Sequence, residues 1–445
     1  ALQSVSPLDG RYEKSTEPLG QFFSEYALIS YRYRVEVAYL QALFPVVHVK
    51  FSRKVFKTVS AELTLADAKR VKKIEEKTNH DVKAVEYLLR EKLDNAGLGH
   101  LKQWTHFALT SEDVNNLAYG LMIRDALTAV ILPRMEELVG VIERLAEKHA
   151  RDVMLARTHG QPASPTTFGK EMAVFVHRLS SHLDEITRTP ICGKLAGATG
   201  NYNAHQVAFP DVDWPVFARE FVESLGLEHN PLVTQIENHD SWAQLFHAIV
   251  RFNTVLIGFN QDIWRYISDG WLGQKPKAGE VGSSTMPHKV NPINFENSEG
   301  NLQLANEGLK FLADKLLISR MQRDLTDSTV QRNIGSYLAY CLLGYDNCLK
   351  GLQKIKVNTA VMREIVQAHP EVLAEAIQTI LRREGDEQAY EKLKELTRGG
   401  SVTMASLHAW IEGLSVSAPV KKELKSLSPD RYIGLAETLA GCEEG

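Results

Sequence analysis

The sequence predicts an all-α protein built around a bundle of unusually long helices. Apolar residues recur every three or four positions over stretches that mostly exceed the usual helix length of about 11–12 residues. Alternating apolar runs bounded by tight turns, which would predict strands, are nearly absent. Hydrophobic residues make up 44% of the 445 positions and charged residues 24%, as in a globular chain and unlike a disordered one.

The long helical patterns lie in the middle of the chain, at 112–150, 166–189, 240–269, 293–317 and 328–354. The first is one helix or two in line, because Pro133 predicts a kink or break. The second carries one apolar stripe, made of Phe168, Met172, Phe175, Leu179, Leu183 and Ile186. The third is apolar on more than one face, as expected for a helix that is buried among several others.

The helices shorten towards both ends of the chain, where prolines and glycines interrupt the pattern. We therefore expect three helical domains: 1–104, a central bundle at 105–354, and 355–445. A long bundle with apolar residues on several faces would expose too much apolar surface as a monomer. The pattern therefore also predicts a homo-oligomer whose core the bundle forms.

The bundle is interrupted at 270–294, where four glycines and three prolines cannot continue a helix. A loop of this length in a compact helical protein is either disordered or functional. Its contents favour function, since Ser283 and Ser284 offer hydroxyls, Lys289 a positive charge and Asn291 an amide. Lids are common among functional loops of this length.

Bulk properties exclude several classes of protein. The net charge of −4 argues against a polyanion binder, and the basic run at 69–73 is typical of a solvated helix face, so no nucleic-acid partner is expected. Four cysteines without metal-type spacing suit a reducing compartment. Charged residues interrupt the most apolar segment, 245–267, and no signal peptide is visible, so we expect a cytoplasmic protein without a membrane partner.

Two polar clusters mark predicted helix starts. Thr78 with Asp81 forms a capping pair for a helix that runs to Lys92, which leaves His80 either without a special role or as an anion contact beside exposed amides. Thr110 with Asp113 forms a second capping pair, where Ser111 and the first-turn amides could bind a carboxylate or phosphate.

Three further clusters have an ordinary structural interpretation beside a functional one. Arg11 and Tyr12 lie near a terminus that is ordinarily mobile. His159, between Arg157 and Gln161, is either a surface turn residue or, given its donor-rich neighbours, a general acid. The segment 319–332 is either a phosphate or carboxylate clamp of three arginines or a charged helix start, with Arg320 and Arg323 paired to Asp324 and Asp327.

Common cofactor motifs are missing: there is no Gly-x-Gly-x-x-Gly, no phosphate loop, no His-Glu-x-x-His and no Gly-x-Ser-x-Gly. We expect neither a cofactor nor a metal.

The loop at 282–292, Gly-Ser-Ser-Thr-Met-Pro-His-Lys-Val-Asn-Pro, resembles the signature of the fumarase/aspartase superfamily. Alone it does not separate fumarases, aspartases, argininosuccinate lyases, adenylosuccinate lyases and cycloisomerases. Further motifs do, and over essentially the whole chain they resemble the bacterial-type adenylosuccinate lyase family. They are Ser-Pro-Leu-Asp-Gly-Arg-Tyr at 6–12, Thr-Asn-His-Asp-Val-Lys-Ala-Val-Glu at 78–86, Arg-Thr-His-Gly-Gln-Pro-Ala at 157–163, Gly-Asn-Tyr-Asn-Ala-His at 200–205 and Arg-Asp-Leu-Thr-Asp-Ser-Thr-Val at 323–330. The stretch 44–60 matches no pattern of the family.

The resemblance implies an all-α homotetramer whose active sites each draw on three chains. It implies a carbon–nitrogen lyase that eliminates fumarate from adenylosuccinate, giving AMP, and from SAICAR, giving AICAR. By this resemblance the loop is a catalytic lid with Ser283 as its base, and His159 is the acid, while His80 and Lys289 assist charge and orientation. The implied substrate contacts are Arg11, Tyr12, Asn79, Asp81, Thr110, Ser111, Gln235, Asn291, Arg323, Ser328 and Arg332.

Two alternatives remain at this point. An argininosuccinate lyase or a cycloisomerase would share the loop but need not share the clusters around Arg11 and His80. An inactive scaffold descended from a lyase is the other, and the intact Ser283, His159 and Lys289 count against it.

Overall fold

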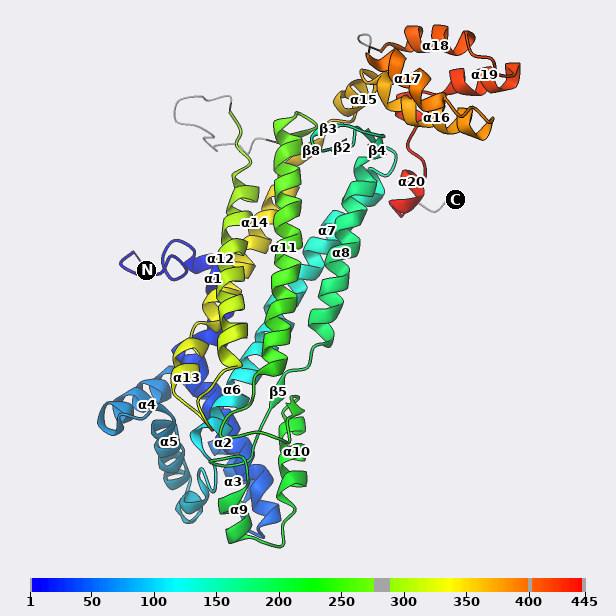
Figure 1. Ribbon diagram of the computed structural model, residues 1–445. Helices are drawn as coiled ribbons and strands as arrows, with labels where there is room; N and C mark the ends of the chain where they lie inside the picture. The colour runs from blue at the N-terminus through cyan, green and yellow to red at the C-terminus, as the bar shows by residue number, and fades with distance from the viewer. Residues whose placement is uncertain (1, 276–288, 399–401, 442–445) are drawn as a thin grey trace. The chain divides into compact units, whose positions relative to one another are not determined.

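The computed structural model describes residues 2–275, 289–398 and 402–441, and most of its elements are helices (Figure 1). The α-helices are α1 (Glu13–Phe23), α2 (Glu25–Val46), α3 (Arg53–Val59), α4 (Leu65–Thr78), α5 (Asp81–Asn95), α6 (Ser111–Ala126), α7 (Leu132–Lys148), α8 (Phe168–Arg188), α9 (Asn203–Ala208), α10 (Trp214–Ser224), α11 (Asp240–Ser268), α12 (Ile293–Leu316), α13 (Thr326–Gln331), α14 (Ile334–Lys354), α15 (Thr359–Gln367), α16 (Ala374–Arg383), α17 (Ala389–Arg398), α18 (Met404–Glu412), α19 (Ala418–Ser426) and α20 (Ala436–Leu439). Shorter helical turns are η1 (Gly99–Trp104), η2 (Leu127–Ile131), η3 (Pro370–Leu373) and η4 (Pro429–Arg431). The predicted all-α class is confirmed.

The strands of the described residues are only two or three residues long and form four separate pairs. Three pairs are antiparallel and one, β5 with β6, is parallel. The strands are β1 (Val153–Met154), β2 (Arg157–Thr158), β3 (Gln161–Pro162), β4 (Thr166–Thr167), β5 (Cys192–Gly193), β6 (Glu228–His229), β7 (Leu272–Gln274) and β8 (Ile355–Val357).

The long helical patterns are present, with their ends adjusted. The irregularity expected at Pro133 is the π-helical turn η2, which lies just before α7. A proline has no N–H to donate to the preceding turn, so a regular helix cannot pass through it undisturbed. Two boundaries were predicted wrongly. Thr166 and Thr167 belong to β4, and the helix expected at 328–354 is two helices separated by Arg332 and Asn333.

The chain contacts define two compact units, and each is described by itself. The first unit contains residues 1–135, 182–254 and 300–346, and the second contains 136–181, 255–299 and 347–445. The division into three domains at 104 and 354 stays a prediction.

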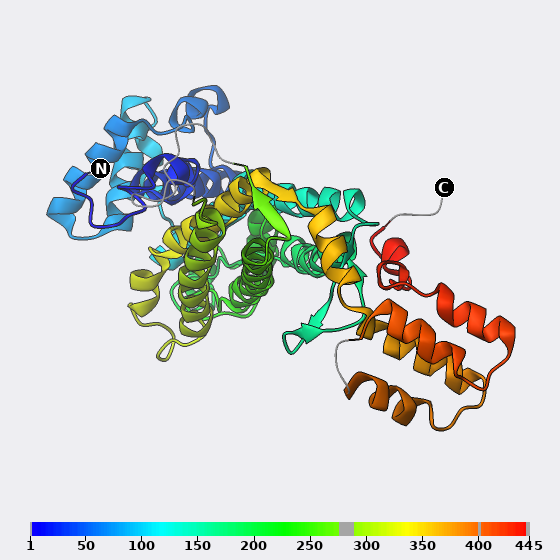
Figure 2. The same ribbon diagram turned by 90° about the horizontal axis from the view of Figure 1, so that it is seen from above.

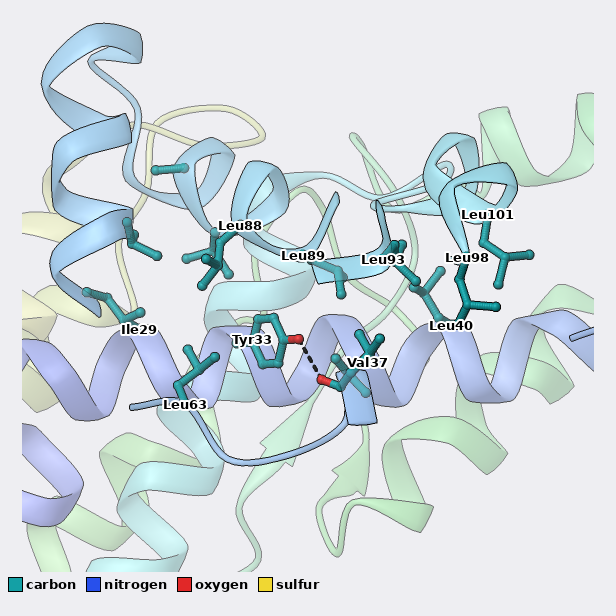
Figure 3. Close-up of a cluster of buried hydrophobic side chains, with 14 of the residues drawn as sticks. Ile29, Tyr33, Val37, Leu40, Leu63, Leu88, Leu89, Leu93, Leu98 and Leu101 are labelled. Carbon is teal, nitrogen blue, oxygen red and sulfur yellow. Dashed lines mark hydrogen bonds between the residues drawn. The ribbon is translucent and has the colours of Figure 1, made fainter. Parts of the chain in front are cut away.

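In the first unit, an apolar cluster packs α2 against α3, α4, α5 and η1 (Figure 3). Tyr33 lies in this cluster and donates its hydroxyl to the carbonyl of Val59 at 2.6 Å, which ties α3 to α2. Phe44 and Phe56 are almost fully buried, with ring centres 5.8 Å apart. The stretch that matched no family pattern therefore contributes to this core.

Helices α11, α12 and α14 run alongside one another (Figure 1), and buried amides connect them within the first unit. Asn253 donates to the Asn306 side chain at 3.0 Å and accepts from the Tyr345 hydroxyl at 2.6 Å. A Cβ at Gly308 would lie 2.1 Å from the ring of Tyr337, so only glycine permits this approach of α12 to α14. Such contacts specify which helix faces pair, since an unsatisfied buried amide is costly.

In the second unit, α16, α17, α18 and α19 gather into a small group near the end of the chain, drawn in orange and red (Figure 2). Their core includes Leu373, Ile377, Leu381, Leu407 and Ile411. Among the described residues of both units, no helix combines the length and the apolar character needed to cross a bilayer.

Candidate active site

The first unit contains a polar cavity of about 400 Å³ at the starts of α5 and α6 and along the segment that leads through α13. It is lined by Glu75, Asn79, His80, Asp81, Val82, Ser111, Asn115, Arg323, Leu325, Ser328, Thr329 and Arg332. Seven of these are predicted substrate or catalytic residues: Asn79, His80, Asp81, Ser111, Arg323, Ser328 and Arg332. Residues that lie far apart in the sequence therefore line one cavity.

The start of α5 differs from the prediction. Thr78 is the last residue of α4, and Asn79 ends that helix in the left-handed conformation, with φ 49°. The residue that caps α5 is His80, whose Nδ1 accepts the backbone N–H of Lys83 at 3.2 Å. The predicted Thr78–Asp81 capping pair is therefore wrong, because Asn79 reverses the chain between the two helices. An accepting Nδ1 leaves the imidazole proton on Nε2.

The start of α6 was predicted correctly. Asp113 accepts the backbone N–H of Thr110 at 2.9 Å, as the capping pair requires. The same carboxylate forms a fully buried ion pair with Lys194, at 2.7 Å, and accepts the N–H of Ala196 at 2.9 Å. These contacts anchor the helix start that carries Ser111 into the cavity.

The cavity arginines are paired with carboxylates of this chain. Arg323 lies 3.0 Å from Glu112 and donates to Ser328 at 3.0 Å and to Gln235 at 3.3 Å. Arg332 contacts Asp81 at 3.0 Å and Glu25 at 3.3 Å. From the sequence, the segment 319–332 could be either a charged helix start or an anion clamp. The expected pairs of Arg320 with Asp324, at 3.2 Å, and of Arg323 with Asp327, at 3.6 Å, are both present.

Burial and charge act in opposite directions on the two carboxyls behind these arginines. Burial raises the pKa of Glu112 above its usual value, although Arg323 opposes this effect. Burial would also raise the pKa of Asp81, but Arg32, the N–H of Val82 and Arg332 together hold it below its usual value. The anchor of Arg332 is therefore a firmly ionised carboxylate.

His159 lies in the second unit, at the tip of the hairpin formed by β2 and β3. His159 has φ 53° and Gly160 has φ 74°, as the tightest two-residue hairpin turn requires. Arg157 supports the turn by donating to the Gly160 carbonyl at 3.2 Å and lies 5.9 Å from the ring centre of Trp271. The side chain of His159 is exposed, so both predicted roles, turn residue and proton donor, suit its position.

The predicted lid is only partly described. β7 occupies 272–274 and pairs with β8, which places a short strand in the expected loop. Lys289 is exposed and Asn291 half-buried, and Gln274 donates to the Val290 carbonyl at 3.1 Å between them. Ser283, the predicted base, lies outside the described residues.

Other predicted contacts lie apart from the cavity lining. Arg11 and Tyr12 are at the start of α1, stacked with 5.9 Å between the guanidinium carbon and the ring centre, and their role stays a prediction. Thr110 is the residue next to Ser111, and Gln235 accepts a hydrogen bond from Arg323, which lines the cavity. Asn115 was missed, although its position one turn after Ser111 on α6 could have revealed it. Glu75 has no comparable local signal.

Comparison with known proteins first defines the class. Residues 10–305 match a family model described as a lyase. A fumarate lyase from Mesorhizobium sp. BNC1 covers 95% of this chain and 96% of its own, at 20% identity and a TM-score of 0.75. A 3-carboxy-cis,cis-muconate lactonizing enzyme from Pseudomonas putida gives the same identity and TM-score over 95% of both chains. The solved structures show the fold, and the family model shows that the chain is a member of the lyases.

Closer relatives define the family. Residues 319–433 match the family model of the adenylosuccinate lyase C-terminal region. An adenylosuccinate lyase from Haemophilus influenzae is 50% identical over 98% of both chains, and one from Escherichia coli K12 is 48% identical over 99% of this chain and 98% of its own. The chain therefore belongs to the adenylosuccinate lyase family.

Proposed function

We propose that this protein eliminates fumarate from adenylosuccinate, giving AMP, and from SAICAR, giving AICAR. The observation that carries the proposal is the cavity that gathers seven of the predicted residues in a chain of this family. Hydroxyls, amides and two arginines around about 400 Å³ suit a polar, phosphorylated ligand. An argininosuccinate lyase or an inactive scaffold is the weaker reading, because the named relatives are adenylosuccinate lyases.

The reaction needs two proton transfers. A base removes a proton from the aspartyl carbon next to a carboxylate, and an acid protonates the departing nitrogen. The first step pushes negative charge into a carboxylate that is already charged, so preorganised donors must stabilise a doubly charged aci-carboxylate. We assign the base to Ser283 and the acid to His159, with Lys289 and Asn291 as donors. A neutral hydroxyl is a weak base, so water must be excluded from the site while Ser283 acts.

We assign the phosphate and ribose side of the substrate to Arg323, Ser328 and Arg332, together with Arg11 and Tyr12. The succinyl group or the purine base of the substrate would be contacted by Thr110, Ser111, Gln235 and Asn291. Asn79 and Asp81 would border the substrate, and His80 would donate from Nε2, because its Nδ1 is occupied by the helix start.

The charge balance of the cavity supports sites that are shared between chains. The cavity arginines already have carboxylate partners, namely Glu112, Asp327, Asp81 and Glu25. A substrate with a phosphate and two carboxylates needs further positive charge, which neighbouring subunits of a homotetramer would supply. Leu304 and Phe311, seven residues apart on α12, are 55% and 49% exposed and suit burial between such subunits.

We also propose a cytoplasmic location. Cys192, Cys341 and Cys348 are free thiols, as expected in a reducing compartment.

The function is tested by following adenylosuccinate conversion to AMP and fumarate by absorbance, with argininosuccinate in parallel. The unaltered protein should convert adenylosuccinate but not argininosuccinate. Ser283→Ala should lose roughly 10²–10⁴-fold in kcat with an unchanged melting temperature, since it removes a general base. Ser284→Ala is the matched control and should keep most activity.

Conversion of argininosuccinate instead would select the alternative lyase. Inactivity on both substrates would select the scaffold. Full activity of Ser283→Ala would remove Ser283 as the base while leaving the substrate assignment intact.

A further inference from the structure

The two cavity arginines, Arg323 and Arg332, are joined by a continuous chain of polar side chains. The chain runs from Arg323 through Glu112, Asn115, Arg32 and Asp81 to Arg332. Its members come from the segment around α13 and from α6, α2 and α5, all within the first unit. Neither Glu112 nor Arg32 lines the cavity, and no sequence motif marks Arg32.

One half of the chain orients Arg323. Glu112 is 1% exposed, and its Oε1 lies 3.0 Å from Nη2 of Arg323. The same oxygen accepts Nδ2 of Asn115 at 2.8 Å. Because Nδ2 donates to Glu112, the amide oxygen of Asn115 must face the other way, where it accepts Nε of Arg32 at 2.8 Å. The orientation of the Asn115 amide is thus determined by both neighbours.

The other half orients Arg332. Arg32 is 3% exposed, and its Nη2 lies 2.8 Å from Oδ2 of Asp81. That oxygen also accepts Nη2 of Arg332 at 3.0 Å. Oδ1 of Asp81 is used by the N–H of Val82 at 2.9 Å, so the carboxylate has little freedom to turn.

Such a chain transmits orientation because its inner members, Glu112, Asn115 and Arg32, are buried, while Arg323 and Arg332 at its two ends are more exposed. An unpaired guanidinium or carboxylate in the interior is costly, so each group keeps its partners when a neighbour moves. Hydrogen bonds in series also polarise one another in a medium of low dielectric. A shift of Arg323 towards a ligand therefore changes the energy of every link up to Arg332.

We propose that Arg32 is a positioning residue that couples Arg323 to Arg332, so that the two arginines engage one phosphorylated ligand as a unit. Arg32 suits this role because its planar guanidinium donates to Asn115 and Asp81 from different nitrogens, which a lysine ammonium cannot imitate. The proposal rests on the proposed function for the identity of the ligand, but not for the coupling itself.

The test is a double-mutant cycle of Arg323→Lys and Arg332→Lys, read as KM for adenylosuccinate and as the Kd of AMP by calorimetry. In the wild-type background the two substitutions should be non-additive by at least about fivefold, as expected for residues of one network. In an Arg32→Lys background the effects should become additive within about twofold. Arg34→Lys is the matched control on α2, since Arg34 is exposed and pairs with Asp125 instead; it should preserve the non-additivity.

Additive effects in the wild-type background, or coupling that survives Arg32→Lys, would overturn the proposal. A merely structural Arg32 would lower the melting temperature and leave the coupling in place. If Arg32→Lys does not fold, Asn115→Ala cuts the chain at the next link and should abolish the coupling in the same way. Binding of inorganic phosphate in the same variants reads the coupling without turnover, so an inactive wild type counts against the proposed function alone.

Discussion

At the scale of single residues, His106 shows how buried charge is balanced in the first unit. Its Nδ1 lies 2.5 Å from Oε1 of Glu36 and 3.7 Å from Oε1 of Glu86, and Glu36 is fully buried. Burial alone would lower the pKa of His106, but Glu36, Glu86 and Asp113 outweigh it, and the pKa is raised above 6.5. His106 is thus the cation that makes the buried Glu36 tolerable.

Replacing His106 with glutamine should destabilise the protein by about 3–5 kcal/mol, because Glu36 keeps its burial and loses its cation. A raised folded-state pKa means that this stabilisation is complete below the unfolded value of 6.5 and is lost as the pH rises through the folded value. Urea unfolding of both proteins at about pH 6 and about pH 9 measures the difference. A difference that grows at the higher pH would contradict the assignment.

At the scale of elements, helix starts serve stability and the cavity at once. α5 begins at a histidine whose Nδ1 replaces the usual capping oxygen, while the same residue lines the cavity. α6 begins at Ser111 and is anchored by the buried pair of Asp113 and Lys194. The helix periodicity predicted the helices α5 and α6, but it did not predict which side chain caps α5.

Two substitutions at His80 separate these roles. His80→Asn keeps a capping acceptor and should keep the melting temperature, whereas His80→Ala should lose about 0.5–2 kcal/mol of stability. Both should lose activity, because neither has an imidazole to donate from Nε2. Thermal unfolding and kcat are measured side by side. Normal activity of the His80→Asn variant would mean that His80 serves only as the cap of α5.

At the scale of the whole molecule, we expect the exposed apolar residues of α12 to be covered by another subunit. Leu304→Glu together with Phe311→Glu should convert the proposed tetramer to smaller species, seen by light scattering, because each places a charge in an apolar interface. Activity should fall with the tetramer if sites are shared. Leu65→Glu is the control, since Leu65 is 61% exposed at the start of α4, where an acidic residue is favourable. A tetramer that persists in the double variant would place the interface elsewhere.

The sequence by itself determined the all-α class, the long helices and the membership of the lyase class. Helix formation depends on contacts three and four residues apart, so periodicity alone predicts α8 and α11 to within a few residues. The motifs around His80, Ser111 and Arg323 likewise named residues that meet in one cavity. The chemistry of these residues follows from their side-chain types, which the sequence gives directly.

Only the tertiary structure decided how these residues are held. Arg32 meets Asn115 across 83 positions, and Arg332 meets Asp81 across 251. Sequence periodicity cannot predict such contacts, because they arise only when separate helices pack and bring their polar groups together. The contacts that only the tertiary structure decided also include the ion pair of Asp113 with Lys194, the cap at His80 and the chain between the two arginines.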